Sequence, residues 1–176
     1  MASDGSGPAE LRALIRSIPD FPKKGVLFRD ITPLLADGKK FRECVRHFKK
    51  LAKSVDYVIS IESRGFILGS ALACELGVGF VPIRKQGKLP HKTHRCAYRL
   101  EYGEAVMEVH VDGLRPGARV VIVDDVLATG GTAKAAVELA EKCGARISGI
   151  FFLIELPALG GRSQLKGHPV HALVSY

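Results

Sequence analysis

Residues 120–132 read Val-Val-Ile-Val-Asp-Asp-Val-Leu-Ala-Thr-Gly-Gly-Thr, and this stretch decides the fold class. Its first four residues are apolar, which is typical of a strand buried on both faces of a parallel sheet. Two adjacent carboxylates, Asp124 and Asp125, come at the end of that run. A Gly- and Thr-rich turn then leads into a segment with helical periodicity, 133–142. The pattern predicts a strand, a turn and a helix, with both acids at the carboxyl edge of the sheet.

The turn after the acids is suited to a phosphate group. A glycine-rich turn exposes backbone N–H groups, and the start of a helix adds partial positive charge. Thr129 and Thr132 can add hydroxyl donors. We therefore predict a phosphate site made by five consecutive residues, Ala128, Thr129, Gly130, Gly131 and Thr132.

The two acids narrow the choice of phosphate compound. Carboxylates repel phosphate, so Asp124 and Asp125 must face another part of the ligand, such as vicinal sugar hydroxyls or a hydrated magnesium ion. A phosphate one sugar away from a diol is a ribose 5-phosphate. The sequence contains neither GxxxxGK[ST] nor a GxGxxG that follows a strand. The alternative, an ordinary strand–turn–helix with solvent-facing acids, leaves the adjacent charges unexplained.

The rest of the chain alternates between apolar strands and helices. We predict strands over 57–61, 79–84, 119–123 and 147–154, an edge strand over 170–174, and a hairpin formed by 97–100 and 105–111. Helices are predicted over 11–18, 41–52, 66–76 and 133–142, with an irregular stretch over 21–35. The order indicates an α/β fold with a mainly parallel, twisted sheet flanked by helices. Ligands bind at the carboxyl ends of the strands in such sheets.

Composition fits one domain over 1–176, with 47% hydrophobic and 25% charged residues. Residues 1–8 have neither a positive start nor an apolar stretch, so we expect no secretory signal and a cytosolic location. The four scattered cysteines are expected to be structural thiols rather than metal ligands or disulfides; Cys44, Cys74 and Cys143, which lie in apparently helical segments, are expected to be buried, and the fourth is Cys96. The net charge is +8, and the basic residues are concentrated in two segments, 41–53 and 84–99. The first of these is interpreted as the solvated face of a helix.

The stretch 120–132 resembles the phosphoribosyl pyrophosphate motif of the type I phosphoribosyltransferases. Further matches to the adenine phosphoribosyltransferase family follow in order over nearly the whole chain, at 21–22, 25–33, 62–66, 83–85, 87–90 and 100–103. The resemblance implies the type I phosphoribosyltransferase fold, with a small N-terminal hood over about 1–35 that contributes the base pocket. It also implies a mobile loop and β-hairpin, about 86–111, over the active site.

The activity that the resemblance implies is transfer of a 5-phosphoribosyl group from phosphoribosyl pyrophosphate to adenine, which gives AMP and pyrophosphate in purine salvage. The catalytic residues would be Glu101, Asp125 and Arg64, with Glu101 handling the proton of the base. The residues around the pyrophosphate would be Ser63, Arg64, Arg84, Lys85 and Lys88. A homodimer is implied, in which Arg84 reaches the neighbouring site. Mg²⁺ would be held mainly by the substrate, with Asp124 and Asp125 contacting it through water.

By the same resemblance, adenine would be read by backbone groups and apolar side chains. The matching residues are Val26, Leu27, Phe28, Arg29 and Val126. Phe28 could stack on the purine and Val126 could cover its other face, although Phe28 could equally be a core anchor. The loop departs from the family at 91–96, which is unusually basic, and Arg99 stands close to Glu101. We expect His91 and His94 to face solvent rather than bind a metal.

Two other functions fit the same residues. One is a phosphoribosyltransferase for another purine base, such as a 6-oxopurine. The other is a non-catalytic regulator that keeps the fold and binds nucleic acid through its positive face. The chain carries no added DNA-binding segment, and both acids and Glu101 are present, which favours the enzyme and no nucleic-acid partner.

Overall fold

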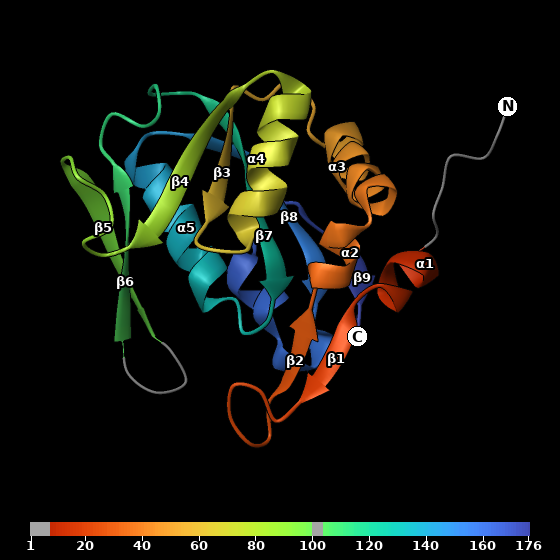
Figure 1. Cartoon of the computed structure of the whole chain (residues 1–176). Coiled ribbons are helices and arrows are strands. Elements are labelled where there is room, and N and C mark those ends of the chain that lie inside the picture. Colours follow the sequence, from red (N-terminus) through yellow and green to blue (C-terminus); the bar gives the residue numbers. More distant parts are fainter. Residues whose placement is uncertain (1–7, 100–103) are drawn as a thin grey trace, which may run out of the picture.

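A seven-stranded sheet forms the centre of the computed structural model, which describes residues 8–99 and 104–176 (Figure 1). The N-terminal half contains α1 (Pro8–Ala13), β1 (Arg16–Pro19), β2 (Leu27–Asp30), α2 (Thr32–Ala36), α3 (Gly38–Leu51), β3 (Tyr57–Ile61), α4 (Gly65–Leu76) and β4 (Gly79–Lys85). The second half contains β5 (Thr93–Arg99), β6 (Glu104–His110), β7 (Arg119–Leu127), α5 (Gly131–Lys142), β8 (Arg146–Glu155), η1 (Pro157–Leu159), η2 (Gly161–Leu165) and β9 (Val170–Ser175).

The strand order is β5-β6-β4-β3-β7-β8-β9. The five strands from β4 to β9 in this order are parallel to one another. β6 pairs antiparallel with β4, and β5 pairs antiparallel with β6. The mainly parallel α/β class predicted from the sequence is therefore confirmed, as is the edge strand at the end of the chain.

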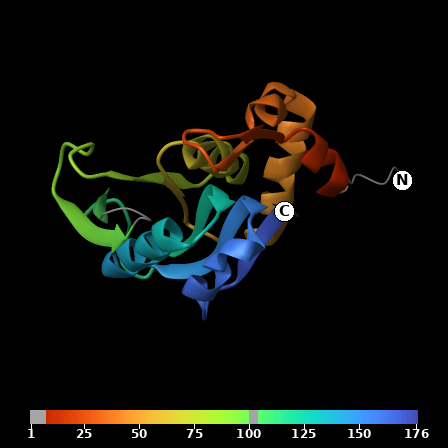
Figure 2. The ribbon, with the colours of Figure 1, turned by 90° about the horizontal axis from the view of Figure 1, so that it is seen from below.

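Helices cover both faces of the sheet, with α3 and α4 on one side and α5 on the other (Figure 2). Successive side chains of a strand point to opposite faces. Along β7, Val120 and Ile122 pack into the core with α5, while Val121 and Val123 pack into the core with α3 and α4. This double burial explains why β7 is apolar at every position from 120 to 123 rather than at alternate ones.

The N-terminal region differs from its prediction. The helix predicted over 11–18 ends at Ala13, and the chain enters β1, which pairs antiparallel with β2 in a small separate sheet. Leu11 and Ile15 are buried, so the apolar spacing was real, but pairing with β2 fixes the backbone of 16–19. The stretch predicted as irregular, 21–35, contains β2 and most of α2. Together α1, β1 and β2 form the unit that we call the hood.

The predicted hairpin is confirmed as β5 and β6, although β5 begins earlier, at Thr93. Its base is attached to α5: Lys142 Nζ donates to the Arg95 carbonyl at 2.7 Å, and Cys96 Sγ donates to Glu138 Oε2 at 3.0 Å. All four cysteines are free, but Cys74 is exposed and not buried as predicted, because it lies on the outer side of α4. In the described part of the chain, no helix has the length and apolar character needed to cross a membrane.

Candidate active site

The predicted site residues are brought together because β3, β4 and β7 are adjacent parallel strands that end at one edge. The pairing of Ile61 with Ile83 places Glu62, after β3, beside Arg84 near the end of β4. The pairing of Ser60 with Val123 places the following turn, 62–65, beside the two acids of β7. Topology thus joins three segments that are far apart in sequence.

Asp124 and Asp125 lie in the C-terminal half of β7, because the strand continues to Leu127 rather than ending before the acids. They are only 8% and 6% exposed, and the Asp125 N–H donates to Asp124 Oδ1 at 2.9 Å. Burial, reinforced by the charge of Asp125, raises the pKa of Asp124 well above its ordinary value. Burial also raises the pKa of Asp125, against the opposing effect of Arg64. The pair is therefore suited to a ligand that supplies hydroxyl donors or positive charge.

Arg64 connects these acids to the hood. Its Nε lies 2.6 Å from Asp125 Oδ2, and its guanidinium carbon lies 4.6 Å from the centre of the Phe28 ring. A terminal nitrogen of Arg64 also reaches the Arg29 carbonyl at 3.5 Å. Within the described residues Asp125 Oδ2 has no well-aligned hydrogen bond, so this contact is an ion pair that leaves the oxygen able to accept from a ligand.

Close packing behind the acids depends on Gly65, which the resemblance placed only in the turn expected around the pyrophosphate, without a role beside the acids. A Cβ atom on Gly65 would lie 2.6 Å from Asp124 Oδ1 and 3.2 Å from Ser60 Oγ. Ser60 in turn donates to the Val123 carbonyl at 2.7 Å. The start of α4 can therefore approach the acids only because residue 65 has no side chain.

The turn predicted to bind phosphate connects β7 to α5. It encloses a hollow of about 70 Å³, which is roughly the volume of two liquid waters. Gly130 has φ +86° at the helix N-cap, and no described side chain caps this helix. The first N–H groups of a helix have no intrahelical partners, so they remain for a ligand. A Cβ on Gly130 would also lie 2.5 Å from the Gly161 carbonyl oxygen, so Gly161 of η2 supports the turn.

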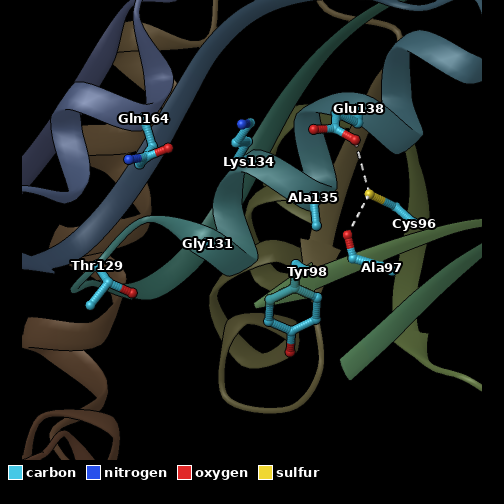
Figure 3. A pocket seen from close by; sticks show the side chains of 9 residues that line it. All are labelled: Cys96, Ala97, Tyr98, Thr129, Gly131, Lys134, Ala135, Glu138 and Gln164. Carbon is cyan, nitrogen blue, oxygen red and sulfur yellow. Dashed lines mark hydrogen bonds between the residues drawn. The ribbon is translucent and has the colours of Figure 1, made fainter. Parts of the chain in front are cut away.

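A larger cavity of about 410 Å³ adjoins this turn, between β5 and the first half of α5 (Figure 3). Thr129 and Gly131 form one side of it, and Tyr98 faces them from the hairpin. The Cys96–Glu138 contact lies at its far end. The cavity therefore separates the hairpin from the phosphate turn near Tyr98, whereas Arg95 and Cys96 of the hairpin contact α5 directly.

Three of the basic residues predicted around the pyrophosphate contact Glu62: Arg84 and Lys88 through their side chains, and Lys85 through its backbone N–H. Glu62 was not among the predicted site residues, although it lies in a matched segment. Arg84 donates to both oxygens of Glu62 at 3.2 Å, and the Lys85 N–H donates to Oε2 at 3.3 Å. The Lys88 ammonium is 3.9 Å from Oε1. Burial alone would raise the pKa of Glu62, but these cations and N–H groups bring it below the ordinary value. Ser63 follows Glu62 in the adjoining turn.

The segment predicted to read adenine lies in and beside β2. The Phe28 ring meets Phe21 edge-on at 5.0 Å and lies under Arg64, so it faces the site and is not a core anchor. Leu27 is exposed, and Val26 is half-buried in the preceding turn. Val126 is half-buried and packs against the core that contains α3 and α4.

Arg29 points to the other side of β2, where its guanidinium carbon lies 3.7 Å from the ring centre of Tyr176. Tyr176 also contacts Arg12, at 4.3 Å, and joins β2 to α1. No local sequence pattern signals this contact, because its partners lie at opposite ends of the chain. Glu101 lies outside the described residues, so its role stays a prediction.

Comparison with known proteins agrees with this geometry. Residues 35–166 match the phosphoribosyl transferase domain family. The chain is 54% identical over 170 residues to the adenine phosphoribosyltransferase of Paracoccus denitrificans, covering 94% of this chain and 91% of that protein.

Two solved structures are similar over nearly their full lengths. The adenine phosphoribosyltransferase of Thermoanaerobacter pseudethanolicus has a TM-score of 0.93 and 47% identity, covering 96% of this chain and 99% of that one. The Saccharomyces cerevisiae enzyme, complexed with an imino-altritol bisphosphate and adenine, has a TM-score of 0.91 and 40% identity, covering 95% and 98%. The chain therefore belongs to the phosphoribosyl transferase domain family.

Proposed function

We propose that the chain transfers the 5-phosphoribosyl group from phosphoribosyl pyrophosphate to adenine and releases AMP and pyrophosphate. The observation that carries this proposal is the buried pair Asp124 and Asp125 next to an uncapped helix N-terminus. The similarity to adenine phosphoribosyltransferases over most of the chain favours adenine over other bases.

The phosphoribosyl group fits the end of β7. The turn 128–132 would hold the 5-phosphate with backbone N–H groups and the hydroxyls of Thr129 and Thr132. The acids would accept hydrogen bonds from the two ribose hydroxyls. Their negative charge also lies where the sugar ring becomes positive as pyrophosphate leaves, so it stabilises the transition state.

Magnesium fits the same acids. Two buried carboxylates whose pKa values are raised by burial gain from a nearby divalent cation, and hard oxygen ligands are those that Mg²⁺ prefers. The ion would screen the charge of the pyrophosphate, with Asp124 and Asp125 contacting it through water. The protein side chains that complete this screening are Arg64, Lys85, Lys88 and Arg84, the last of which is proposed to act in the neighbouring subunit of a homodimer.

Arg64 has to change partners during the reaction. In the structure it pairs with Asp125 and covers one face of Phe28. We propose that it turns to the pyrophosphate when the substrate binds, which frees Asp125 for the ribose and Phe28 for stacking on adenine. Glu101 would then accept the proton that the attacking base must lose.

Closure over the reactants would exclude water and prevent hydrolysis of the substrate. Because the contacts of Arg95 and Cys96 attach the hairpin to α5, we expect closure to involve the connection between β5 and β6, to which Glu101 belongs by sequence, rather than the whole hairpin. The homodimer and the cytosolic location stay predictions, which sedimentation and cell fractionation would test.

The test of the function is a pyrophosphate-release assay with phosphoribosyl pyrophosphate, Mg²⁺ and adenine, hypoxanthine or guanine in parallel. We expect turnover with adenine only, and its loss in Asp125→Asn. Asp112→Asn is the matched control, because Asp112 is exposed and contacts only His91, at 4.0 Å, in the described part of the chain. Preferred turnover of a 6-oxopurine would replace adenine as the substrate. Salt-sensitive binding to RNA or DNA without any turnover would support the regulator instead.

A further inference from the structure

Glu108 is a buried carboxylate that the proposed reaction does not use. It lies on β6, opposite Arg84 of β4, and is 1% exposed. Burial alone would raise its pKa, but the N–H groups and the hydroxyl that it accepts from bring the pKa below the ordinary value. A charged group in such a place is costly unless every part of it is satisfied. Its partners therefore indicate what it does.

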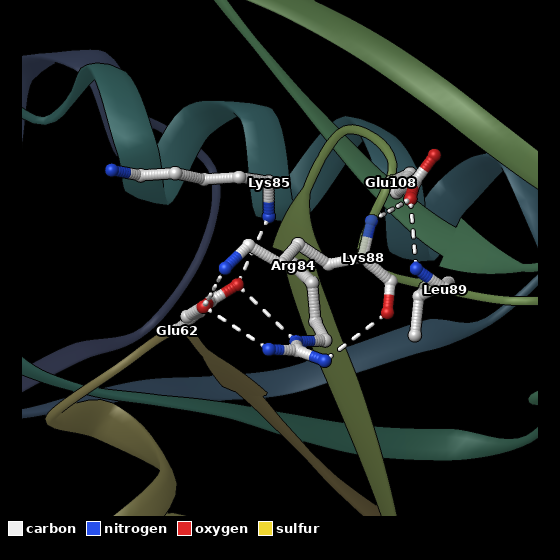
Figure 4. A network of polar contacts seen from close by, with 6 residues as sticks. All are labelled: Glu62, Arg84, Lys85, Lys88, Leu89 and Glu108. Carbon is white, nitrogen blue, oxygen red and sulfur yellow. Dashed lines mark hydrogen bonds and ion pairs between the residues drawn. The ribbon is translucent and has the colours of Figure 1, made fainter.

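Within the described residues, the polar contacts of the Glu108 carboxylate fall on the segment that follows β4, 87–95. Oε1 accepts from the N–H groups of Lys88 and Leu89, both at 3.1 Å (Figure 4). Oε2 accepts from Thr93 Oγ1 at 3.2 Å and lies 3.4 Å from Arg95 Nε. One side chain thus fixes both the start and the end of the connection between β4 and β5.

Lys88 is held from its other side as well. Its carbonyl oxygen accepts from one guanidinium nitrogen of Arg84 at 3.1 Å, while the other two nitrogens of that group donate to Glu62 (Figure 4). The backbone of Lys88 is therefore fixed at N–H by Glu108 and at C=O by Arg84. Its side chain stays half exposed, with the ammonium 3.9 Å from Glu62.

From this network we infer that Glu108 is a positioning residue that holds Lys88 and Arg84 in place for the pyrophosphate of the substrate. This inference rests on the proposed function. Glu108 does not touch the substrate itself: it sets the backbone from which Lys88 extends and the carbonyl to which Arg84 is bound. Loss of Glu108 should therefore weaken binding of pyrophosphate and of phosphoribosyl pyrophosphate, and should leave binding of adenine unchanged.

A purely structural role would give a different result. If Glu108 only stabilised the hairpin, its removal would lower stability and would impair both substrates together, since the hairpin is expected from the sequence to carry Glu101. A rise in KM for phosphoribosyl pyrophosphate without a rise in KM for adenine thus distinguishes positioning from general destabilisation.

The experiment compares four variants with the wild type. Glu108→Ala removes all contacts, Glu108→Gln keeps one oxygen that can accept from Lys88 and Leu89, and Thr93→Val removes a single contact. Glu138→Gln is the control, since Glu138 contacts the hairpin at Cys96 and not the segment 87–92. KM for both substrates, inhibition by pyrophosphate with Mg²⁺, and amide hydrogen exchange over 86–93 are measured for each.

For Glu108→Ala we expect KM for phosphoribosyl pyrophosphate and the inhibition constant of pyrophosphate to rise roughly tenfold or more, the scale of losing charge-assisted hydrogen bonds. Exchange over 86–93 should become faster, KM for adenine should change by less than about twofold, and Glu108→Gln should recover part of the loss. Thr93→Val should shift in the same direction by a smaller factor, and it decides the question if Glu108→Ala does not fold.

A folded Glu108→Ala, or Thr93→Val in its place, with unchanged KM for phosphoribosyl pyrophosphate would overturn the inference. So would an equal rise in both KM values. Failure of the proposed function is separate, because it would appear as absent turnover in the wild type. In that case hydrogen exchange and direct binding of pyrophosphate with Mg²⁺ still report whether Glu108 holds a site for that anion.

Discussion

Nε of Arg64 lies 2.6 Å from Oδ2 of Asp125, which joins a residue expected at the pyrophosphate to a residue expected at the ribose. Each partner thus offsets the buried or partly buried charge of the other before any substrate is present. In the proposed mechanism substrate binding separates them, since the acid is assigned to the sugar and the cation to the leaving group. The free energy of this pair is therefore part of the free energy of substrate binding.

Arg64→Ala should lower kcat/KM with adenine by at least about 100-fold, because a charge aimed at the leaving pyrophosphate is lost. Arg64→Lys keeps the charge but loses the planar contact with Phe28, so it should be impaired less. Steady-state assays of both variants give the measurement. Arg64→Ala with activity within about twofold of the wild type would exclude Arg64 from the transition state.

Asp124→Asn should stabilise the ligand-free protein while abolishing turnover. Burial and the charge of Asp125 raise the pKa of Asp124 in the folded state, so the folded protein binds more protons at this site than the unfolded chain. The contribution of this group to stability therefore falls as pH rises from about 4, the ordinary Asp value, through the raised value. At pH 8 a gain of about 1 kcal/mol would raise Tm by about 2–4 °C.

The control is Asp125→Asn, which should gain less because Arg64 would lose its partner. Thermal unfolding at pH 5 and pH 8, expressed as the difference from the wild type, isolates this pair from the other acids. An Asp124→Asn protein that is less stable than the wild type at pH 8 would show that the pair is not under electrostatic strain.

Gly65→Ala should impair both stability and activity, because its Cβ would lie 2.6 Å from Asp124 Oδ1. We expect a loss of about 1–3 kcal/mol in the free energy of unfolding, measured with urea. Gly38→Ala is the matched control: it also begins a helix, and a Cβ there has no described atom within 4 Å. Equal behaviour of the two variants would contradict the close packing of α4 against the acids.

Glu101→Gln should lower turnover by orders of magnitude and spare binding of phosphoribosyl pyrophosphate, because the amide cannot take the proton of the base. This prediction rests on the sequence alone, since Glu101 lies outside the described residues. Glu104→Gln, three positions further on, is the control. Turnover like that of the wild type in Glu101→Gln would remove Glu101 from the mechanism.

The sequence was sufficient where the signal is local. The apolar run of 120–123, the acids and the glycines of the turn lie within thirteen consecutive residues, and they predict the strand, turn and helix, although the strand continues past the acids to Leu127. The sequence was insufficient where a partner lies far along the chain. β1 exists because 16–19 pairs with 27–30, a contact that helical spacing cannot reveal.

The same limit applies to the site. Glu62 and Glu108 read as ordinary surface charges until the register of β4 places them beside Arg84 and Lys88. Gly65 reads as a turn residue until Asp124 is placed beside it. Residues expected to touch the substrate carry a motif, whereas the residues proposed to hold them in place are identified only by the fold.

A crystal structure of the chain with AMP tests the central claim most directly. We predict the phosphate of AMP against the backbone of 128–132, the ribose hydroxyls within hydrogen-bond distance of Asp124 and Asp125, and the purine beside Phe28. A nucleotide bound elsewhere, or a ribose that leaves both acids without contact, would contradict the account.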